Sequence, residues 1–340
     1  MTKYFDLDDN GKRLFIEQTA IHVGLPKIVV EKDLWVTLML QVVFQLPFAD
    51  KLVFKGGSSL SKVWGLINRM SEDIDLAYGD NFGTFNGDSP TIKQIKKLRK
   101  ASSVFVRTEF CDSLREAIVR LGLDAWCNVE PQEDGEGDNT YPEPRQVYVT
   151  YKSLFPEEYG QITSEYIKPT VMLEVSARSL MEPHADATVN SMLSEAYPQV
   201  DTQILQSNIR TALPAKTFLE KAFLLHELFS TDRCANANRK SRHLYDLERM
   251  MDEPFAREAV TDDALWQSIS HHRKHYTSMK GIDYDTDIRK VITLLPPEEY
   301  LSAWELDYNI MREKMILAGN AIPFNQMLER MTELQARFRR

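Results

Sequence analysis

The sequence KGGSSL at residues 55–60 is followed at short range by RMSEDIDL at residues 69–76. The apolar run 52–54 before it predicts a buried strand that enters a tight glycine turn, and the alternating pattern of 73–78 predicts a second strand. Because glycine has no side chain, the backbone N–H groups of such a turn can approach an anion, and the helix expected next offers its positive end. The order strand, glycine turn, helix, strand therefore predicts a sheet-bearing domain that can hold a phosphate group.

Periodic apolar residues predict helices and further strands on both sides of this stretch. We expect helices at 11–23, 26–45, 58–67 and 91–121, and strands at 125–130, 146–151 and 171–177. From residue 205 onward the pattern is helical, with segments at 217–229, 239–251, 262–275, 297–317 and 324–337. A chain of 340 residues is long enough for two domains. The predicted fold class is α+β: a small mixed sheet flanked by helices in residues 1–205, and a mainly helical domain in residues 206–340.

The composition is that of a soluble globular protein, with 43% hydrophobic and 27% charged residues. No apolar run approaches the roughly 18 to 20 residues of a membrane span, and the N-terminus lacks a signal-peptide core, so we expect a cytoplasmic protein without membrane contact. The three cysteines form no CxxC pair, which predicts reduced thiols and neither a disulfide nor a zinc site.

The net charge of −9 argues against a protein that coats nucleic acid nonspecifically, because such binding depends on neutralising phosphates. Two local basic groups stay open as exceptions. The first lies at the start of the 91–121 helix and contains Lys93, Lys96, Lys97, Arg99 and Lys100. The second is C-terminal and contains Arg337, Arg339 and Arg340. A solvated helix face and a frayed tail are the alternative interpretations.

Two carboxylates and a serine recur at strand spacing after the glycine turn. Asp73 and Asp75 lie two residues apart on the expected strand, so both side chains emerge on one face and can grip the same divalent ion. Mg²⁺, or Mn²⁺ in its place, favours such oxygen ligands together with substrate phosphates. Ser71 shares this parity and could bond to a phosphate.

A site with two metal ions usually needs a third carboxylate from a neighbouring strand. Glu174 is the best candidate, because strand alternation sets it apart from the apolar residues around it. Exposure on an edge strand is the alternative for this residue. Glu130, at the end of another expected strand, is the reserve choice.

At this level of detail the sequence resembles a known family. GGSSLSK at 56–62 and RMSEDIDL at 69–76 resemble motif I of the AbiEii/AbiGii toxin family, nucleotidyltransferase-like proteins related to the MenT toxins. VEKDLWV at 30–36 resembles the segment that the family carries upstream of the glycine turn. TFLEKA at 217–222 and RHLYDL at 242–247 resemble its lysine and Arg-Asp-x-x-Asp motifs. The resemblances follow the family's order and imply a nucleotidyltransferase-like sheet.

The resemblance also implies roles for individual residues. It implies that Asp73 and Asp75 bind metal, that Lys221 contacts nucleotide phosphates and that Asp246 completes the catalytic set. The implied nucleotide-binding residues are Gly56, Gly57, Ser58, Ser59, Lys62, Arg69, Ser71 and Arg242. An ion pair between Lys221 and Asp246 that only joins two helices is the alternative. The sequence departs from the family at His243, where an aspartate is usual.

The function implied by the resemblance is metal-dependent transfer of a nucleoside monophosphate from an NTP to an acceptor hydroxyl. Its candidate acceptor is the 3′ end of tRNA, and its candidate role is the toxin of a type IV toxin–antitoxin or abortive-infection system, with the antitoxin encoded upstream. Nucleotidylation of a protein or small molecule, and nucleotide binding without catalysis, stay open. A DxD glycosyltransferase is disfavoured, because mostly helical residues rather than a nucleotide-binding half precede Asp73.

Overall fold

The computed structural model describes residues 2–70, 73–137, 140–159, 167–201, 208–316, 319 and 321–340. The chain divides into two compact units. The first comprises Met1–Val63, Ser71–Thr84 and Lys96–Thr211, and the second comprises Trp64–Met70, Phe85–Ile95 and Ala212–Arg340. Two short segments from the first third of the sequence therefore belong to the second unit. The predicted boundary at residue 205 lies outside the described residues.

The first unit contains a seven-stranded mixed sheet with the strand order β4-β5-β6-β3-β2-β9-β7. Its central strand β3 runs antiparallel to β2 and parallel to β6. The strands are β2 (Leu52–Lys55), β3 (Asp73–Tyr78), β4 (Cys127–Pro131), β5 (Arg145–Tyr151), β6 (Thr170–Ser176), β7 (His184–Ala187) and β9 (Ile209–Ala212). A separate two-stranded sheet pairs β1 (Thr2–Lys3) with β8 (Val200–Asp201). The predicted mixed sheet with flanking helices is confirmed.

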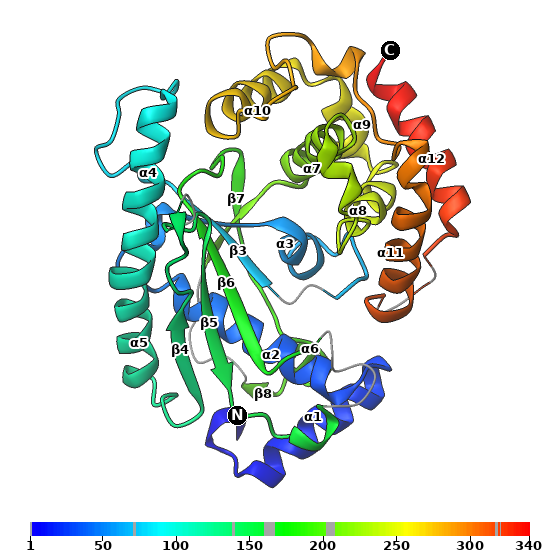
Figure 1. Ribbon diagram of the computed structural model, residues 1–340. Coiled ribbons are helices and arrows are strands. Elements are labelled where there is room, and N and C mark those ends of the chain that lie inside the picture. The colour runs from blue at the N-terminus through cyan, green and yellow to red at the C-terminus, as the bar shows by residue number, and fades with distance from the viewer. Residues whose placement is uncertain are drawn as a thin grey trace. The chain divides into compact units, whose positions relative to one another are not determined.

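The core of the first unit lies between the sheet and its helices. These are α1 (Asp9–Val23), α2 (Lys27–Val43), α3 (Gly56–Lys62), α4 (Ile92–Phe105), α5 (Cys111–Arg120) and α6 (Met192–Ala196); the first turn of α4, up to Ile95, is counted with the second unit. Helix α2 packs on β3 and β6, and α5 packs on β4. Figure 1 shows α4 continuing into α5 beside β4 and β5. The predicted helix 91–121 is interrupted by a π-helical turn, Val106–Phe110.

The helix after the glycine turn is shorter than the predicted 58–67. Helix α3 begins at Gly56 and ends at Lys62, so neither Ser58 nor Ser59 caps it. Beyond its end, Gly65 has a φ of 60°, in the left-handed region that interrupts a helix. Trp64 belongs to the second unit, where its Nε1 donates to the carbonyl oxygen of Ala212 at 3.1 Å.

The second unit is a bundle of helices around α7. The helices are α7 (Pro214–Phe229), α8 (Arg242–Met250), α9 (Pro254–Thr261), α10 (Asp263–Tyr276), α11 (Leu301–Lys314) and α12 (Phe324–Phe338). Helix α7 packs on α8, α9 and α10. Aromatic contacts join these helices: the ring centroids of Phe223 and Trp266 lie 4.5 Å apart, and those of Trp266 and Phe338 lie 5.5 Å apart. The sequence predicted this helical series but not the short helix α9.

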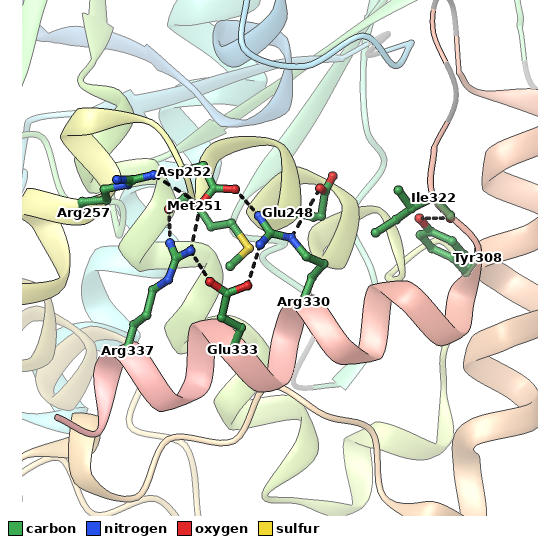
Figure 2. A network of polar contacts seen from close by, with 9 residues as sticks. All are labelled: Glu248, Met251, Asp252, Arg257, Tyr308, Ile322, Arg330, Glu333 and Arg337. Carbon is green, nitrogen blue, oxygen red and sulfur yellow. Dashed lines mark hydrogen bonds and ion pairs between the residues drawn. The ribbon is translucent and has the colours of Figure 1, made fainter.

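Ion pairs hold the last helix against the turn that follows α8 (Figure 2). Arg337 donates to Asp252 at 2.7 Å and to Glu333 at 2.5 Å, and Arg330 also contacts both carboxylates.

All three cysteines are free thiols. Within the described ranges, no helix combines the length and the apolar character needed to cross a membrane.

Candidate functional site

Polar side chains line up across four adjacent strands of the sheet. In the strand registers, Asp75 of β3 lies opposite Lys55 of β2 on one side and Glu174 of β6 on the other. Gln146 of β5 continues the row beside Glu174. Laterally adjacent residues share a face of a sheet, so these four side chains emerge together. The row brings the predicted third carboxylate next to the predicted metal-binding strand.

The alternation along β3 agrees with the predicted placement of its two aspartates. Ile74 and Leu76 are fully buried, whereas Asp73 and Asp75 are partly exposed on the opposite face. Glu174 of β6 is likewise partly exposed between buried apolar neighbours. Glu130, the reserve choice, is exposed on the edge strand β4 and accepts a hydrogen bond from Asn128 at 2.8 Å. The roles of these carboxylates in metal binding stay predictions.

The glycine turn is packed directly against Asp75. Gly56 has a φ of 79°, in the region that favours glycine. A Cβ atom at this position would overlap Oδ2 of Asp75 and would lie 2.9 Å from its Cγ. The backbone conformation and the close approach of the carboxylate therefore both require glycine here. This contact joins the predicted phosphate-holding turn to the predicted metal-binding strand.

The electrostatic environment of Glu174 is dominated by burial and by its acidic neighbours. Burial raises the pKa of the Glu174 carboxyl, and the negative charge of Asp75 raises it further. Lys55 and the Gln146 amide act on this pKa in the opposite direction. A bound cation would relieve the repulsion among the carboxylates of this face.

The polar face does not form a complete metal cage by itself. In the part of the chain that the structure describes, no group of three or more histidine, cysteine or acidic residues is arranged to hold a metal ion. Mg²⁺ is usually held by one or two carboxylates together with waters and substrate phosphates. The chemistry of Asp73 and Asp75 fits such a shared site, in which the nucleotide supplies the remaining oxygen ligands.

Two residues that the sequence analysis missed support Glu174. The Tyr148 hydroxyl donates to Oε1 of Gln146 at 2.5 Å, and Gln146 forms a side-chain hydrogen bond with Glu174. Because the amide oxygen accepts from tyrosine, the amide nitrogen is left to donate to the carboxylate. Both residues are polar and lie two apart on the predicted strand 146–151. This alternation could have indicated from the sequence that they share the polar face.

The serines of the turn are used to fix the backbone. Ser58 and Ser59 are fully buried. The Ser58 hydroxyl donates to the carbonyl oxygen of Asp73, and the Ser59 hydroxyl donates to that of Gly56 at 2.9 Å. The Ser58 bond holds α3 to the first residue of β3, and the Ser59 bond lies within the first turn of α3. Ser71, the other predicted phosphate contact, lies outside the described residues.

Lys62, a predicted nucleotide-binding residue, forms an ion pair at the end of α3. Its Nζ contacts Oδ1 of Asp33 on α2, and both side chains are largely buried. The other oxygen of Asp33 accepts from the backbone N–H of Met192 at 2.7 Å. The pair therefore fixes α3 relative to α2 and α6 within the first unit.

Arg69, Lys221 and Asp246 lie together in the second unit, although Arg69 precedes Asp246 by 177 positions in the sequence. Arg69 donates from Nε and Nη2 to the two oxygens of Asp246, each at 2.7 Å. Lys221 Nζ lies 2.8 Å from Oδ2 of the same carboxylate. Asp246 is completely buried, and Arg69 is 2% exposed. This bidentate arrangement is the strong form of an arginine–carboxylate contact.

The charges of this cluster set its protonation. Burial alone would raise the pKa of Asp246, but the adjacent Arg69 and Lys221 outweigh it and hold that pKa well below its ordinary value. Burial lowers the pKa of Lys221, and Asp246 opposes this change. Because three donors already occupy its two oxygens, Asp246 is suited to orienting Lys221 and Arg69 rather than to binding a substrate itself.

His243, where the resemblance implies an aspartate, lies beside Lys221. Its Nδ1 lies 3.4 Å from Nζ of Lys221. Burial, and then the positive charges of Lys221 and Arg242, lower the pKa of His243 well below its ordinary value. The imidazole is therefore neutral at pH 7 and its Nδ1 accepts from the lysine ammonium. His243 therefore places a neutral acceptor beside Lys221.

The match to a known protein family covers both the glycine turn and the lysine cluster. A family described as nucleotidyl transferase AbiEii toxin, type IV TA system, matches residues 38–330. The chain belongs to the AbiEii family. The family description makes this AbiEii protein a nucleotidyltransferase toxin of the type IV kind, and such a toxin implies a cognate antitoxin.

Solved structures resemble the AbiEii chain over most of its length. MenT4, the nucleotidyltransferase toxin Rv2826c from Mycobacterium tuberculosis H37Rv, is 15% identical, with a TM-score of 0.45 and coverage of 96% of this chain and 99% of that one. JHP933 from Helicobacter pylori is 13% identical, with a TM-score of 0.44 and coverage of 92% and 91%. No curated protein matches the AbiEii chain.

Proposed function

We propose that this AbiEii protein transfers a nucleoside monophosphate from an NTP to an acceptor hydroxyl, using Mg²⁺ or Mn²⁺ bound by Asp73 and Asp75. The acceptor hydroxyl loses its proton to solvent, its oxygen forms a bond to the α-phosphorus, the bond from that phosphorus to the bridging oxygen breaks, and pyrophosphate leaves. The observation that carries the proposal is the contact between Gly56 and Asp75. It puts a turn able to hold phosphate against a carboxylate able to hold the metal.

The proposal gives each part of the polar face a task. Backbone N–H groups of residues 56–59 hold the triphosphate, while the buried serine hydroxyls keep that backbone in place. When bound, the metal neutralises phosphate charge as pyrophosphate leaves. Glu174 serves as the third carboxylate beside Asp75. Lys62 acts through its ion pair with Asp33, which fixes α3.

In the second unit, the proposal assigns charge neutralisation to the basic residues. Lys221 contacts nucleotide phosphates, and Asp246 orients its ammonium group together with Arg69. Lysine is a compact charge suited to a polyphosphate. Arg242, at the first turn of α8, is assigned to the same task. His243 accepts a hydrogen bond from Lys221 and adds no competing negative charge.

For the acceptor, we propose the 3′ end of tRNA, and for the biological role, a cytoplasmic toxin whose antitoxin is encoded upstream. The family description names a type IV toxin–antitoxin system, which supports the toxin role. Nucleotidylation of a protein or small molecule is the second candidate, since the polar face would serve any acceptor hydroxyl. Nucleotide binding without transfer is the third.

The test compares the wild type with the Asp73→Ala/Asp75→Ala double variant. Each α-labelled NTP is incubated with separate tRNA and protein pools, with and without Mg²⁺. We expect label on tRNA with the wild type plus Mg²⁺, and none with the double variant. Asp50→Asn/Asp124→Asn is the matched control, because both residues are exposed aspartates of the first unit.

The outcomes separate the three candidates. Label on protein instead of tRNA supports the second candidate, and binding of NTP without any transfer supports the third. Full NMP transfer by the double variant would refute a mechanism that depends on Asp73 and Asp75. The folding of the double variant is checked by thermal unfolding. We expect the wild-type unfolding temperature, because removing repulsive charges from a half-exposed face should not destabilise the protein.

A further inference from the structure

Helix α4 concentrates positive charge in an acidic protein. The whole chain has 41 lysines and arginines against 50 aspartates and glutamates. The sequence of α4, IKQIKKLRKASSVF, contains no acidic residue. Its basic residues are Lys93, Lys96, Lys97, Arg99 and Lys100. We call the four lysines of this set the α4 lysine face.

The opposite side of α4 is anchored in the core. Leu98 is fully buried, and the Phe105 ring stacks on Tyr78 with centroids 4.7 Å apart. Phe105 also contacts Phe48 at a centroid distance of 5.2 Å. This packing fixes the rotation of the helix about its axis. All four lysines of the α4 lysine face are exposed, so the core holds them toward solvent.

The α4 lysine face is not neutralised by neighbouring acids. Among the described residues, none of its lysines forms an ion pair. Lys100 makes a cation–π contact, with its Nζ 5.1 Å from the centroid of the Tyr141 ring. An ammonium over an aromatic ring keeps its full charge.

The C-terminal basic group differs in this respect. Arg337 is bound to Asp252 and Glu333, as Figure 2 shows. Arg339 donates to the carbonyl oxygen of Ile292 at 2.6 Å. Two of the three arginines of the C-terminal basic group, Arg337 and Arg339, are therefore tied into the helical bundle. The α4 lysine face has charges available to a partner.

We infer that the α4 lysine face is a docking surface for the phosphate backbone of an RNA acceptor. The inference rests on the proposed function, because that function supplies RNA as the acceptor class. From Lys93 to Lys100 the helix rises about 10 Å. A strand of duplex nucleic acid carries one phosphate per roughly 3.4 Å of axis, so the face spans about three phosphates.

This docking surface would give the protein orientation without sequence selectivity. Lysine ammonium groups bind phosphate oxygens as point charges and read no base edges. Their contribution comes from counterion release and therefore falls as salt rises. The net charge of −9 disfavours nonspecific attraction of nucleic acid to the molecule as a whole.

The test measures binding of a fluorescently labelled, deacylated tRNA pool in the absence of nucleotide, at 50 and 200 mM salt. The test variant is Lys93→Gln/Lys96→Gln/Lys97→Gln/Lys100→Gln. The matched control removes the same charge from four exposed lysines elsewhere: Lys152→Gln/Lys168→Gln/Lys280→Gln/Lys290→Gln. Glutamine has nearly the helix propensity of lysine, so unchanged thermal unfolding is expected for the test variant.

For about three phosphate contacts, the wild type should lose roughly 20- to 40-fold more affinity than the test variant between the two salt concentrations. The control should follow the wild type, and KM for the NTP should be unchanged in the test variant. Equal affinity and equal salt dependence for the test variant and the wild type would overturn the inference.

Failure of this inference can be told from failure of the proposed function. The Asp73→Ala/Asp75→Ala variant should still bind the labelled tRNA pool like the wild type. Salt-dependent binding through the α4 lysine face without any NMP transfer would refute the proposed function and support the docking surface. Transfer to tRNA with wild-type KM for tRNA in the test variant would support the function and overturn the docking surface.

Discussion

Substitution of Gly56 by alanine should separate backbone strain from damage to the polar face. Two costs are expected. The left-handed φ of 79° costs an alanine about 1–2 kcal/mol. Its Cβ would also overlap the Asp75 carboxylate, and relief of such overpacking typically costs a further 1–3 kcal/mol. The carboxylate must move to make room.

Gly24→Ala is the matched control for this experiment. Gly24 also lies in the first unit, has a φ of 69°, and its added Cβ would meet nothing within 4 Å. The two variants share the backbone cost and the entropy effect in the unfolded chain. In urea denaturation, Gly56→Ala should therefore be about 1–3 kcal/mol less stable than Gly24→Ala.

Activity should separate the two variants further. A displacement of about 1 Å in a catalytic group can cost roughly 100-fold in rate. We expect Gly56→Ala to lose at least that factor in NMP transfer, and Gly24→Ala to keep wild-type activity. Adding Asp75→Ala removes the overlapping oxygen but leaves its Cβ 3.2 Å away. In that background, most of the extra destabilisation by Gly56→Ala should disappear. Equal stability of the two glycine variants, or full transfer by Gly56→Ala, would refute the reasoning.

Two further predictions concern the lysine cluster and Glu174. The pKa of His243 is lowered on folding, so below about pH 6.5 the unfolded chain binds this proton first and the free energy of unfolding falls, by at most about 1.4 kcal/mol per pH unit. His243→Gln should reduce the dependence of the free energy of unfolding on pH, measured by urea denaturation between pH 7.5 and 5.5. The exposed-site control is His22→Gln. An unchanged pH dependence in His243→Gln, or the same reduction in the control, would contradict this prediction. Gln146→Leu removes the hydrogen bond to Glu174 and should weaken Mn²⁺ binding, measured calorimetrically with NTP present, about tenfold. Thr150→Val, on the same face of β5, should bind as the wild type does, and unchanged affinity in Gln146→Leu would exclude a role for the amide.

Local patterns were sufficient to predict the polar face. Strand alternation places Asp73 and Asp75 on one face whatever the neighbours are, and it isolates Glu174 from its apolar flanks in the same way. The need for glycine at position 56 follows from its place between a strand and a helix. These features depend on a few consecutive residues, which is why the sequence alone indicates them.

Features that depend on distant partners could not be read from the sequence. Helical spacing extends past Lys62, but Gly65 and the contact of Trp64 with Ala212 end the helix there. The bidentate pairing of Arg69 joins it to a residue 177 positions away. Short strands such as β7 and β9 carry too few residues to show a period. The hydrogen bonds of the Ser58 and Ser59 hydroxyls likewise depend on which backbone carbonyl oxygens the fold brings near them.

The way in which the chain passes between the two units limits how the protein can be dissected. Trp64–Met70 lies in the second unit, although α3 and β3 on either side of it in the sequence lie in the first. A truncation after residue 211 would keep Trp64–Met70 but remove Ala212–Arg340, so Arg69 would lose Asp246 and the segment would lose the rest of its unit. Fragments cut at the apparent domain border should therefore misfold or aggregate. Complementation would require co-expression of both pieces.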